Sequence, residues 1–116
     1  MARRRKRRTT RTQTDSIPEL TGLALLLVET PVESLDLHGM TADGAEQRLR
    51  FFLERHHVTS SGRVVHVITG KGGHSTGPPV LPGLVRELLM HELSEIVAEL
   101  GGLTGGGGFA VRISGG

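Results

Sequence analysis

Two short apolar segments with one amphipathic helix between them constrain this chain more than any other feature. Residues 35–38 (LDLH) and 63–68 (RVVHVI) have the length and the apolar or β-branched content of strands. Between them, residues 42–57 carry apolar side chains at helical spacing on one face, after a suitable N-cap at Thr41. A strand–helix–strand unit of this kind joins two parallel strands by a right-handed crossover. We therefore expect an α/β fold.

The C-terminal half adds one more helix and two more strands. Residues 81–93 predict a helix, with Pro82 in its first turn, where a missing N–H does no harm. Residues 95–100 and 109–114 predict strands joined by a glycine-rich turn. The expected order is β-α-β-α-β-β, a compact two-layer sandwich in which two main helices cover a four-stranded mixed sheet.

The chain divides into three regions. Residues 1–15 contain almost nothing to bury, so we expect a disordered basic tail. Residues 16–34 are interpreted as a linker. Within it, residues 19–29 (ELTGLALLLVE) form either a short helix or an extra strand, because periodicity cannot decide for so short a run. Residues 35–114 are expected to form the folded domain.

The charge of the chain separates into a cationic arm and an acidic body. Half of the 14 basic residues lie in the first eleven positions, whereas all 12 acidic residues lie beyond them. A block of like charges repels itself and binds polyanions, of which nucleic acid is the first candidate, although a purely solubilising tail is the alternative. The arm would bind phosphates without reading sequence. Its cations are Arg3, Arg4, Arg5, Lys6, Arg7, Arg8 and Arg11.

Composition excludes several classes of protein. The chain has no cysteine, which excludes disulfide frameworks, thiolate zinc sites and cysteine nucleophiles. No apolar run approaches the ~20 residues that span a bilayer, and the basic N-terminus is not followed by the apolar stretch of a secretory signal. We therefore expect a cytoplasmic protein with no membrane partner.

The first two strands bring candidate functional residues to one edge of the sheet. Asp36 and His38 point to the same face, because residues two apart in a strand do so. The glycine-rich loop after residues 63–68 begins at the carboxyl end of the second strand. Since the two strands are expected to be parallel, the acid–histidine pair and this loop should meet at the edge where α/β sheets bind ligands.

The loop TGKGGHS suits a phosphate. Glycines let backbone N–H groups approach an anion, and Lys71 adds a positive charge. The spacing of a P-loop is absent, so no nucleotide cofactor is expected. The candidate phosphate contacts are Thr69, Gly70, Lys71, Gly72, His74 and Ser75.

The candidate functional residues also have purely structural interpretations. A lone aspartate at a strand end is often only a helix cap, and a glycine-rich loop is often only a turn. His66 lies in the middle of a strand and is interpreted as a core histidine, whereas His56 and His57 end a helix, where the dipole favours a cation. The chain has only three aromatic residues, so base stacking is expected to be a minor mode of binding.

Three segments, LDLHGMTADGAEQRL, ITGKGGHSTG and GGGGFAVRI, resemble the Smr (small MutS-related) domain family in order and spacing. The resemblance covers about residues 35–114. It implies a compact α/β sandwich similar to the C-terminal domain of bacterial translation initiation factor three. The family's LDxH motif corresponds to residues 35–38, and its H-G-x-G or T-G-x-G loop corresponds to residues 69–72.

The resemblance also implies binding to DNA or RNA, and for several members it implies nicking endonuclease or ribonuclease activity. Here His38 would act as general base on water or a ribose 2′-hydroxyl. Asp36 would orient His38 or hold a divalent cation, Mg²⁺ or Mn²⁺. Lys71 and the loop amides would stabilise the phosphorane charge.

One departure bears on activity. Many members of the family carry histidine where this chain has Thr69. If catalysis needs a loop histidine, His74 would have to supply it. The alternative function is therefore a binding module without catalysis, for DNA, RNA or the ribosome.

Overall fold

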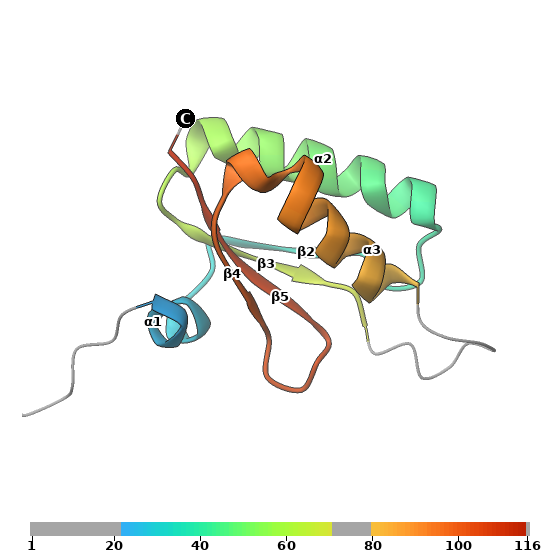
Figure 1. Cartoon of the computed structure of the whole chain (residues 1–116), viewed down its shortest axis with the longest axis horizontal. Coiled ribbons are helices and arrows are strands. Elements are labelled where there is room, and N and C mark those ends of the chain that lie inside the picture. Colours follow the sequence, from blue (N-terminus) through green and yellow to red (C-terminus); the bar gives the residue numbers. More distant parts are fainter. Residues whose placement is uncertain (1–21, 71–79, 116) are drawn as a thin grey trace, which may run out of the picture.

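The computed structural model describes residues 22–70 and 80–115. Three α-helices and a four-stranded sheet follow one another in the order shown in Figure 1. A π-helical turn, Leu88–Glu92, and a 3₁₀ turn, Ser94–Ile96, join the last helix to the third strand of the chain. The main elements are α1 (Gly22–Val28), β2 (Glu33–Asp36), α2 (Ala42–Thr59), β3 (Val64–Ile68), α3 (Leu81–Glu87), β4 (Val97–Gly102) and β5 (Gly108–Ile113).

The sheet is mixed, with the strand order β2-β3-β5-β4. Strands β2 and β3 are parallel, with Asp36 opposite Ile68 at their carboxyl ends. Strand β5 is antiparallel to both β3 and β4, and the β4–β5 hairpin turns through Gly105 and Gly106 at positive φ. The expected α/β class and four-stranded mixed sheet are confirmed.

The helix layer, α2 with α3, covers one face of the sheet (Figure 1). Helix α2 begins where the sequence indicated, because the Thr41 hydroxyl accepts the Gly44 N–H and caps the first turn. Its apolar face enters the main core together with Leu35, Val65 and Val111 of the sheet. The buried residues of α2 are Ala45, Leu49, Phe52, Leu53 and His56.

For the described residues of the segment 19–29, helix α1 decides the open question in favour of a helix. It packs on the opposite face of the sheet from α2 and α3 (Figure 1), where Leu26 contacts Val64 and Ala110 in a second small core. A Cβ at Gly101 of β4 would lie 2.5 Å from Leu23 Cδ1, which is too close. The absence of a side chain at Gly101 therefore allows the helix to pack directly against the strand. This packing adds a partial third layer to the expected two-layer sandwich.

The largest difference from the predicted element boundaries follows α3. Residues 81–93 were expected to be one helix, but regular α-helix ends at Glu87 and the π-helical turn follows. There the Leu93 N–H bonds to the Leu88 carbonyl instead of the carbonyl four residues back. Because of these extra turns, β4 begins two residues later than expected and spans residues 97–102 and not 95–100.

Within the described ranges, no helix is long and apolar enough to cross a membrane.

Candidate functional site

Asp36 and His38 form a hydrogen-bonded pair at the carboxyl end of β2. Oδ1 of Asp36 lies 2.6 Å from Nδ1 of His38 and also accepts the backbone N–H of His38 at 3.0 Å. The Leu37 N–H donates to the Ile68 carbonyl, which extends the pairing with β3 past the end of β2. Gly39, at φ +79°, then turns the chain toward α2. Both side chains are more than half exposed, so a large ligand can reach them.

The start of the glycine-rich loop lies directly beside this pair. A Cβ at Gly70, which has φ +79°, would stand 3.1 Å from the Cβ of His38. The parallel register of β2 and β3 accounts for this contact, since Asp36 and Ile68 end their strands together. The expectation that the acid–histidine pair and the loop share one edge is therefore confirmed for Thr69 and Gly70, the part of the loop that the structure describes. We call this edge, formed by Asp36, His38, Thr69 and Gly70, the rim.

Thr69 and Gly70 are tied to the β4–β5 hairpin. The backbone N–H groups of both residues donate to the Gly107 carbonyl, at 2.9 and 3.0 Å. The Thr69 side chain is buried, and its hydroxyl lies 3.2 Å from the Gly70 carbonyl and 3.4 Å from the Gly107 carbonyl, so that its one hydrogen is donated to either of them. These two amides are thus engaged within the protein. The sequence did not predict this contact of Gly107 with the rim. No local motif marks Gly107, which is brought to the rim by the register in which β5 pairs with β3.

Asp36 is held in its ionised form. The side-chain hydrogen bond from His38, followed by the backbone hydrogen bond from His38, lowers the pKa of Asp36 below its ordinary value. An ionised Asp36 accepts the hydrogen on Nδ1 of His38, which fixes the tautomer of the ring. The other ring nitrogen, Nε2, takes no part in this hydrogen bond, so its lone pair can accept a proton. This is the arrangement that general-base chemistry requires.

Several predicted site residues lie outside the described ranges. They are Lys71, Gly72, His74 and Ser75 of the loop, and Arg3, Arg4, Arg5, Lys6, Arg7, Arg8 and Arg11 of the arm. The structure therefore places four of the predicted residues, Asp36, His38, Thr69 and Gly70, at the rim.

The rim does not offer the ligand set of a protein-enclosed metal site. Among the described residues, no group of three or more His, Asp and Glu side chains converges. Oδ1 of Asp36 already accepts two hydrogen bonds, so Oδ2 is its free oxygen. Mg²⁺ is commonly held by one or two carboxylates together with water and substrate phosphates. Asp36 fits only that open type of site.

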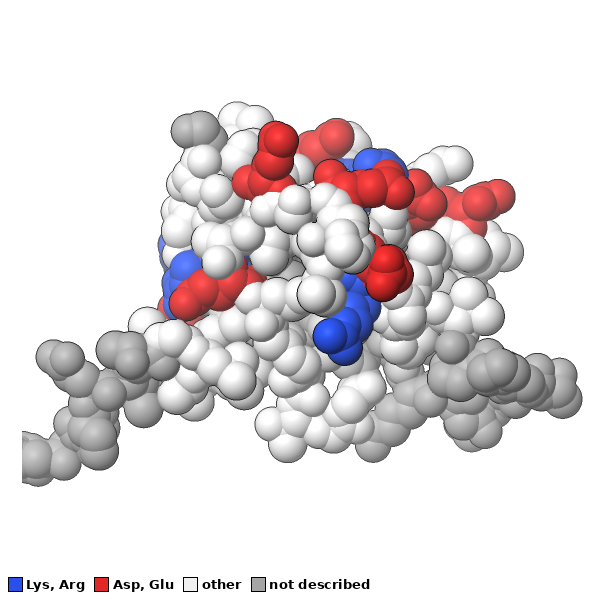
Figure 2. Space-filling model, in the orientation of Figure 1, with Lys and Arg blue, Asp and Glu red and all other residues white. Residues whose placement is uncertain are grey.

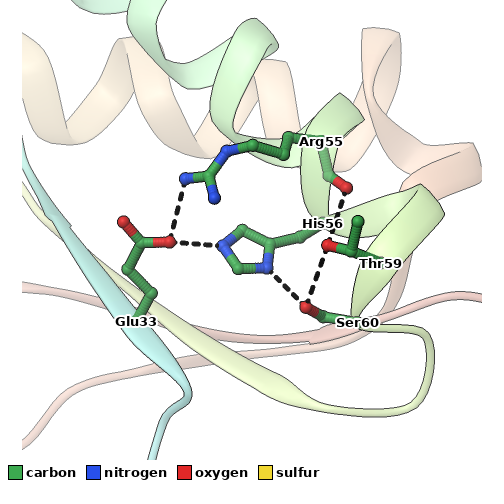
Figure 3. A network of polar contacts seen from close by, with 5 residues as sticks. All are labelled: Glu33, Arg55, His56, Thr59 and Ser60. Atoms are coloured by element: carbon green, nitrogen blue, oxygen red, sulfur yellow. Dashed lines mark hydrogen bonds and ion pairs between the residues drawn. The ribbon is translucent and has the colours of Figure 1, made fainter.

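Three other histidines of the body, His56, His57 and His66, have structural environments. His56 is buried, and its ring bonds Glu33 through Nε2 and Ser60 through Nδ1, at 2.8 and 2.7 Å (Figure 3). His57 bonds the Ser114 carbonyl. His66 is half-buried on the sheet face opposite α2, where burial lowers its pKa. These contacts agree with the structural interpretation of His56, His57 and His66.

Negative charge gathers over the helix layer. In Figure 2 the acidic side chains lie mainly over α2, α3 and the π-helical turn. Glu99 of β4 and Glu29 pair with Arg112, and the turn of the β4–β5 hairpin, residues 103–107, carries no acidic residue. The carboxylates of the helix layer include Asp43, Glu46, Glu54, Glu87 and Glu92. A polyanion is therefore repelled from that part of the helix layer and meets less repulsion near the hairpin end of the sheet.

The comparison with protein families agrees with the geometry. The family model described as "Smr domain" matches residues 35–111, which include the carboxyl end of β2, the rim and most of β5. No curated protein sequence matches the chain significantly. Smr domains form a nucleic-acid-binding and nuclease-type family. The matched residues make up well over half of the chain, and the chain therefore belongs to the Smr domain family.

Proposed function

We propose that this Smr domain binds nucleic acid and cleaves its phosphodiester bonds at the rim. The observation that carries the proposal is the 2.6 Å contact between the exposed side chains of Asp36 and His38, beside the start of a glycine-rich loop. An exposed, oriented imidazole next to a phosphate-type loop provides a base within reach of a backbone phosphate. Neither residue is needed for the core, which favours a chemical role.

His38 is the general base of the proposed reaction. Asp36 holds the proton on Nδ1, so Nε2 takes a proton from water or from a ribose 2′-hydroxyl. The oxygen that loses this proton attacks phosphorus as the bond to the leaving oxygen breaks, and the leaving oxygen takes up a proton from the imidazolium or from solvent. Asp36 stabilises the imidazolium in the interval.

The loop is proposed to bind the phosphate. Because the Thr69 and Gly70 amides already donate to Gly107, these two residues anchor the loop. Direct contact with the phosphate then falls to the residues that follow, which are Lys71, Gly72, His74 and Ser75. A cationic side chain and backbone amides that donate to the phosphate would stabilise the charge that develops on the phosphoryl oxygens. A divalent cation on Asp36 Oδ2 would add to this stabilisation, but no step of the proposal depends on one.

The experiment compares cleavage by the Asp36→Ala and His38→Ala variants with cleavage by matched controls. Glu54→Ala and His91→Ala remove the same kinds of side chain from exposed positions away from the rim. Nicking of plasmid DNA and cleavage of structured RNA are assayed with and without Mg²⁺ or Mn²⁺. The rim variants should lose at least a hundredfold in rate, since general-base catalysis contributes about 10²–10⁴-fold. Equal cleavage by the rim and control variants would refute the catalytic role.

A binding module without catalysis is the second candidate, favoured by the cationic arm and by Thr69 in place of the family's loop histidine. Ribosomal RNA is one polyanion such a module would bind, by family analogy alone. Each phosphate neutralised on duplex DNA contributes about −0.9 to the slope of log K against log salt. Deleting residues 1–11 should flatten this slope and leave cleavage of saturated substrate intact if the two functions are separate.

A further inference from the structure

The two exposed flanks of α2 differ in charge. The flank toward the π-helical turn carries Asp43, Glu46 and Glu54, and on this side Arg50 is paired with Glu46 and Glu92. The opposite flank of the helix carries no carboxylate. Its residues, at helical spacing, are Gly44, Arg48, Phe51, Arg55 and Val58. One helix thus separates an acidic surface from a basic one.

The basic flank borders strand β2, which is an edge of the sheet. Arg55 reaches across to Glu33 of β2 at 2.9 Å, which fixes the direction of this flank (Figure 3). Arg48 is exposed and makes no ion pair within the described ranges. The Phe51 ring, one turn further along, is 69% exposed. We call Arg48, Phe51 and Arg55 the basic stripe.

The basic stripe starts close to the rim. Helix α2 begins four residues after His38, and Arg48 lies six residues into it, about 9 Å along the axis. A polymer bound at Asp36 and His38 that continues along the outer side of β2 therefore meets Arg48 first, then Phe51 and Arg55. The acidic flank would repel the same polymer.

From this juxtaposition we infer that the basic stripe binds unpaired nucleotides next to the bond that is cleaved, with the Phe51 ring stacked on a base and Arg48 on a flanking phosphate, while Arg55 stays paired with Glu33. The inference rests on the proposed function, and it names the substrate class as nucleic acid with a single-stranded segment. A base can reach a ring on a helix surface only when it has left its own stack. The count of aromatic residues led us to expect that base stacking is a minor mode of binding. The inference agrees with that expectation in assigning stacking to a single residue, Phe51.

Charge favours nucleic acid over a protein as the occupant of this surface. Isolated exposed apolar side chains are common, so the exposure of Phe51 alone would carry no weight. What distinguishes Phe51 is the arginine one turn before it, the second arginine one turn after it, and the rim at the end of the same flank. Guanidinium groups pair with phosphates and stack beside bases.

The test measures binding with full-length protein in an Asp36→Ala background, so that cleavage does not interfere. Fluorescence anisotropy gives Kd for a blunt duplex and for the same duplex with a single-stranded extension, in DNA and RNA versions. Phe51→Ala should weaken binding to the extended substrate roughly fivefold to a hundredfold, the range for one base–aromatic stack, with little change for the blunt duplex. Phe51→Tyr, which keeps a ring, should bind like the parent.

Arg48→Ala is compared with Arg86→Ala, which removes an exposed arginine from α3 instead. Arg48→Ala should reduce the magnitude of the salt slope for the extended substrate by about 0.7, the single-strand value for one phosphate, and Arg86→Ala should not. Circular dichroism melting checks that each variant is folded.

The inference is overturned if Phe51→Ala and Arg86→Ala bind the extended substrate equally well. It is also overturned if Phe51→Ala weakens binding to both substrates to the same extent, or if its main effect is to abolish self-association in sedimentation, which would assign the stripe to a second copy. The proposed function can fail separately: if cleavage survives Asp36→Ala, the same Kd comparisons are made with phosphorothioate-linked substrates that resist cleavage.

Discussion

Gly70 and His38 are in contact across the ends of two parallel strands, and a Cβ on Gly70 would lie 3.1 Å from the Cβ of His38. The backbone of Gly70 also has φ +79°, a conformation that L side chains adopt at a penalty of about 1–2 kcal/mol. The glycine therefore serves two purposes, one conformational and one steric. A matched glycine elsewhere allows the two to be separated.

Gly70→Ala should impair cleavage more than its effect on stability explains. Gly62 has φ +80°, but a Cβ there would meet nothing within 4 Å, and Gly62 lies at the opposite end of β3. Both alanine variants should lose about 1–2 kcal/mol of unfolding free energy in urea titrations. Only Gly70→Ala should also reduce the cleavage rate or the affinity for nucleic acid, because it displaces His38. Equal activity of the two variants would show that the contact has no functional role.

The pairing of Asp36 with His38 predicts a specific titration. The pKa of Asp36 should lie below its ordinary value of 3.8 in the intact protein. In His38→Ala it should rise toward that value, because the side-chain hydrogen bond, the largest cause of the shift, is lost, whereas the backbone N–H of residue 38 remains. Carboxyl ¹³C NMR measures the titration directly, with His57→Ala as the control that should leave the pKa low. An unchanged Asp36 pKa in His38→Ala would mean that the pair does not form in solution.

The fold could be predicted from the sequence where the pattern is local. The apolar content of residues 35–38 and 63–68, the helical spacing of residues 42–57 and the Thr41 cap were enough to predict two parallel strands joined by a helix, although β2 spans Glu33–Asp36 and ends before His38. The position of Asp36 and His38 beside the start of the loop followed from that topology. Helix α1 was not decided, because its seven residues are almost all apolar and have no polar face to give a period. Its seat at Gly101 depends on a contact across the sheet that no local pattern reveals.

Contacts between distant parts of the chain account for the rest. His56 was correctly interpreted as structural, but its partner Glu33 lies 23 residues away and was not anticipated. Similarly, the Gly107 carbonyl that anchors Thr69 and Gly70 is placed by the antiparallel pairing of β3 with β5. Residue types indicate that such groups need partners. Only the tertiary arrangement identifies the partners.

The His56 network should stabilise the junction of α2 with β2. The His56 ring is buried, packs edge-on against Phe52 with centroids 4.7 Å apart, and bonds both Glu33 and Ser60 (Figure 3). His56→Ala should reduce the unfolding free energy by about 2–3 kcal/mol, since it removes buried packing and two hydrogen bonds. His91→Ala, at an exposed position, should change it by less than about 0.5 kcal/mol.

The same network predicts how stability depends on pH. Hydrogen bonds from His56 and then from Arg55 lower the pKa of Glu33 below its ordinary value of 4.5. The folded state therefore binds this proton less readily than the unfolded state, so the contribution is present above pH 4.5 and is lost as the pH falls through the lowered pKa. Chemical denaturation between neutral pH and pH 3 should show a shallower acid decline in Glu33→Gln than in the wild type. Parallel curves would exclude a contribution from Glu33.

Gly108 should tolerate substitution far less than Gly102, a glycine of the other hairpin strand that pairs with Phe109. A Cβ at Gly108 would collide with the carbonyl oxygen of Val67, a backbone atom that cannot move without breaking the β3–β5 pairing. A Cβ at Gly102 would meet nothing within 4 Å, although Gly102 is also in a strand and is paired with β5. Gly108→Ala should lose about 1–3 kcal/mol, the usual penalty of overpacking, whereas Gly102→Ala should be neutral or slightly stabilising. Since Gly107 anchors the rim from the adjacent position, Gly108→Ala should also lower activity at temperatures where the variant is still fully folded. An active Gly108→Ala with unchanged melting temperature would show that the hairpin does not hold the rim.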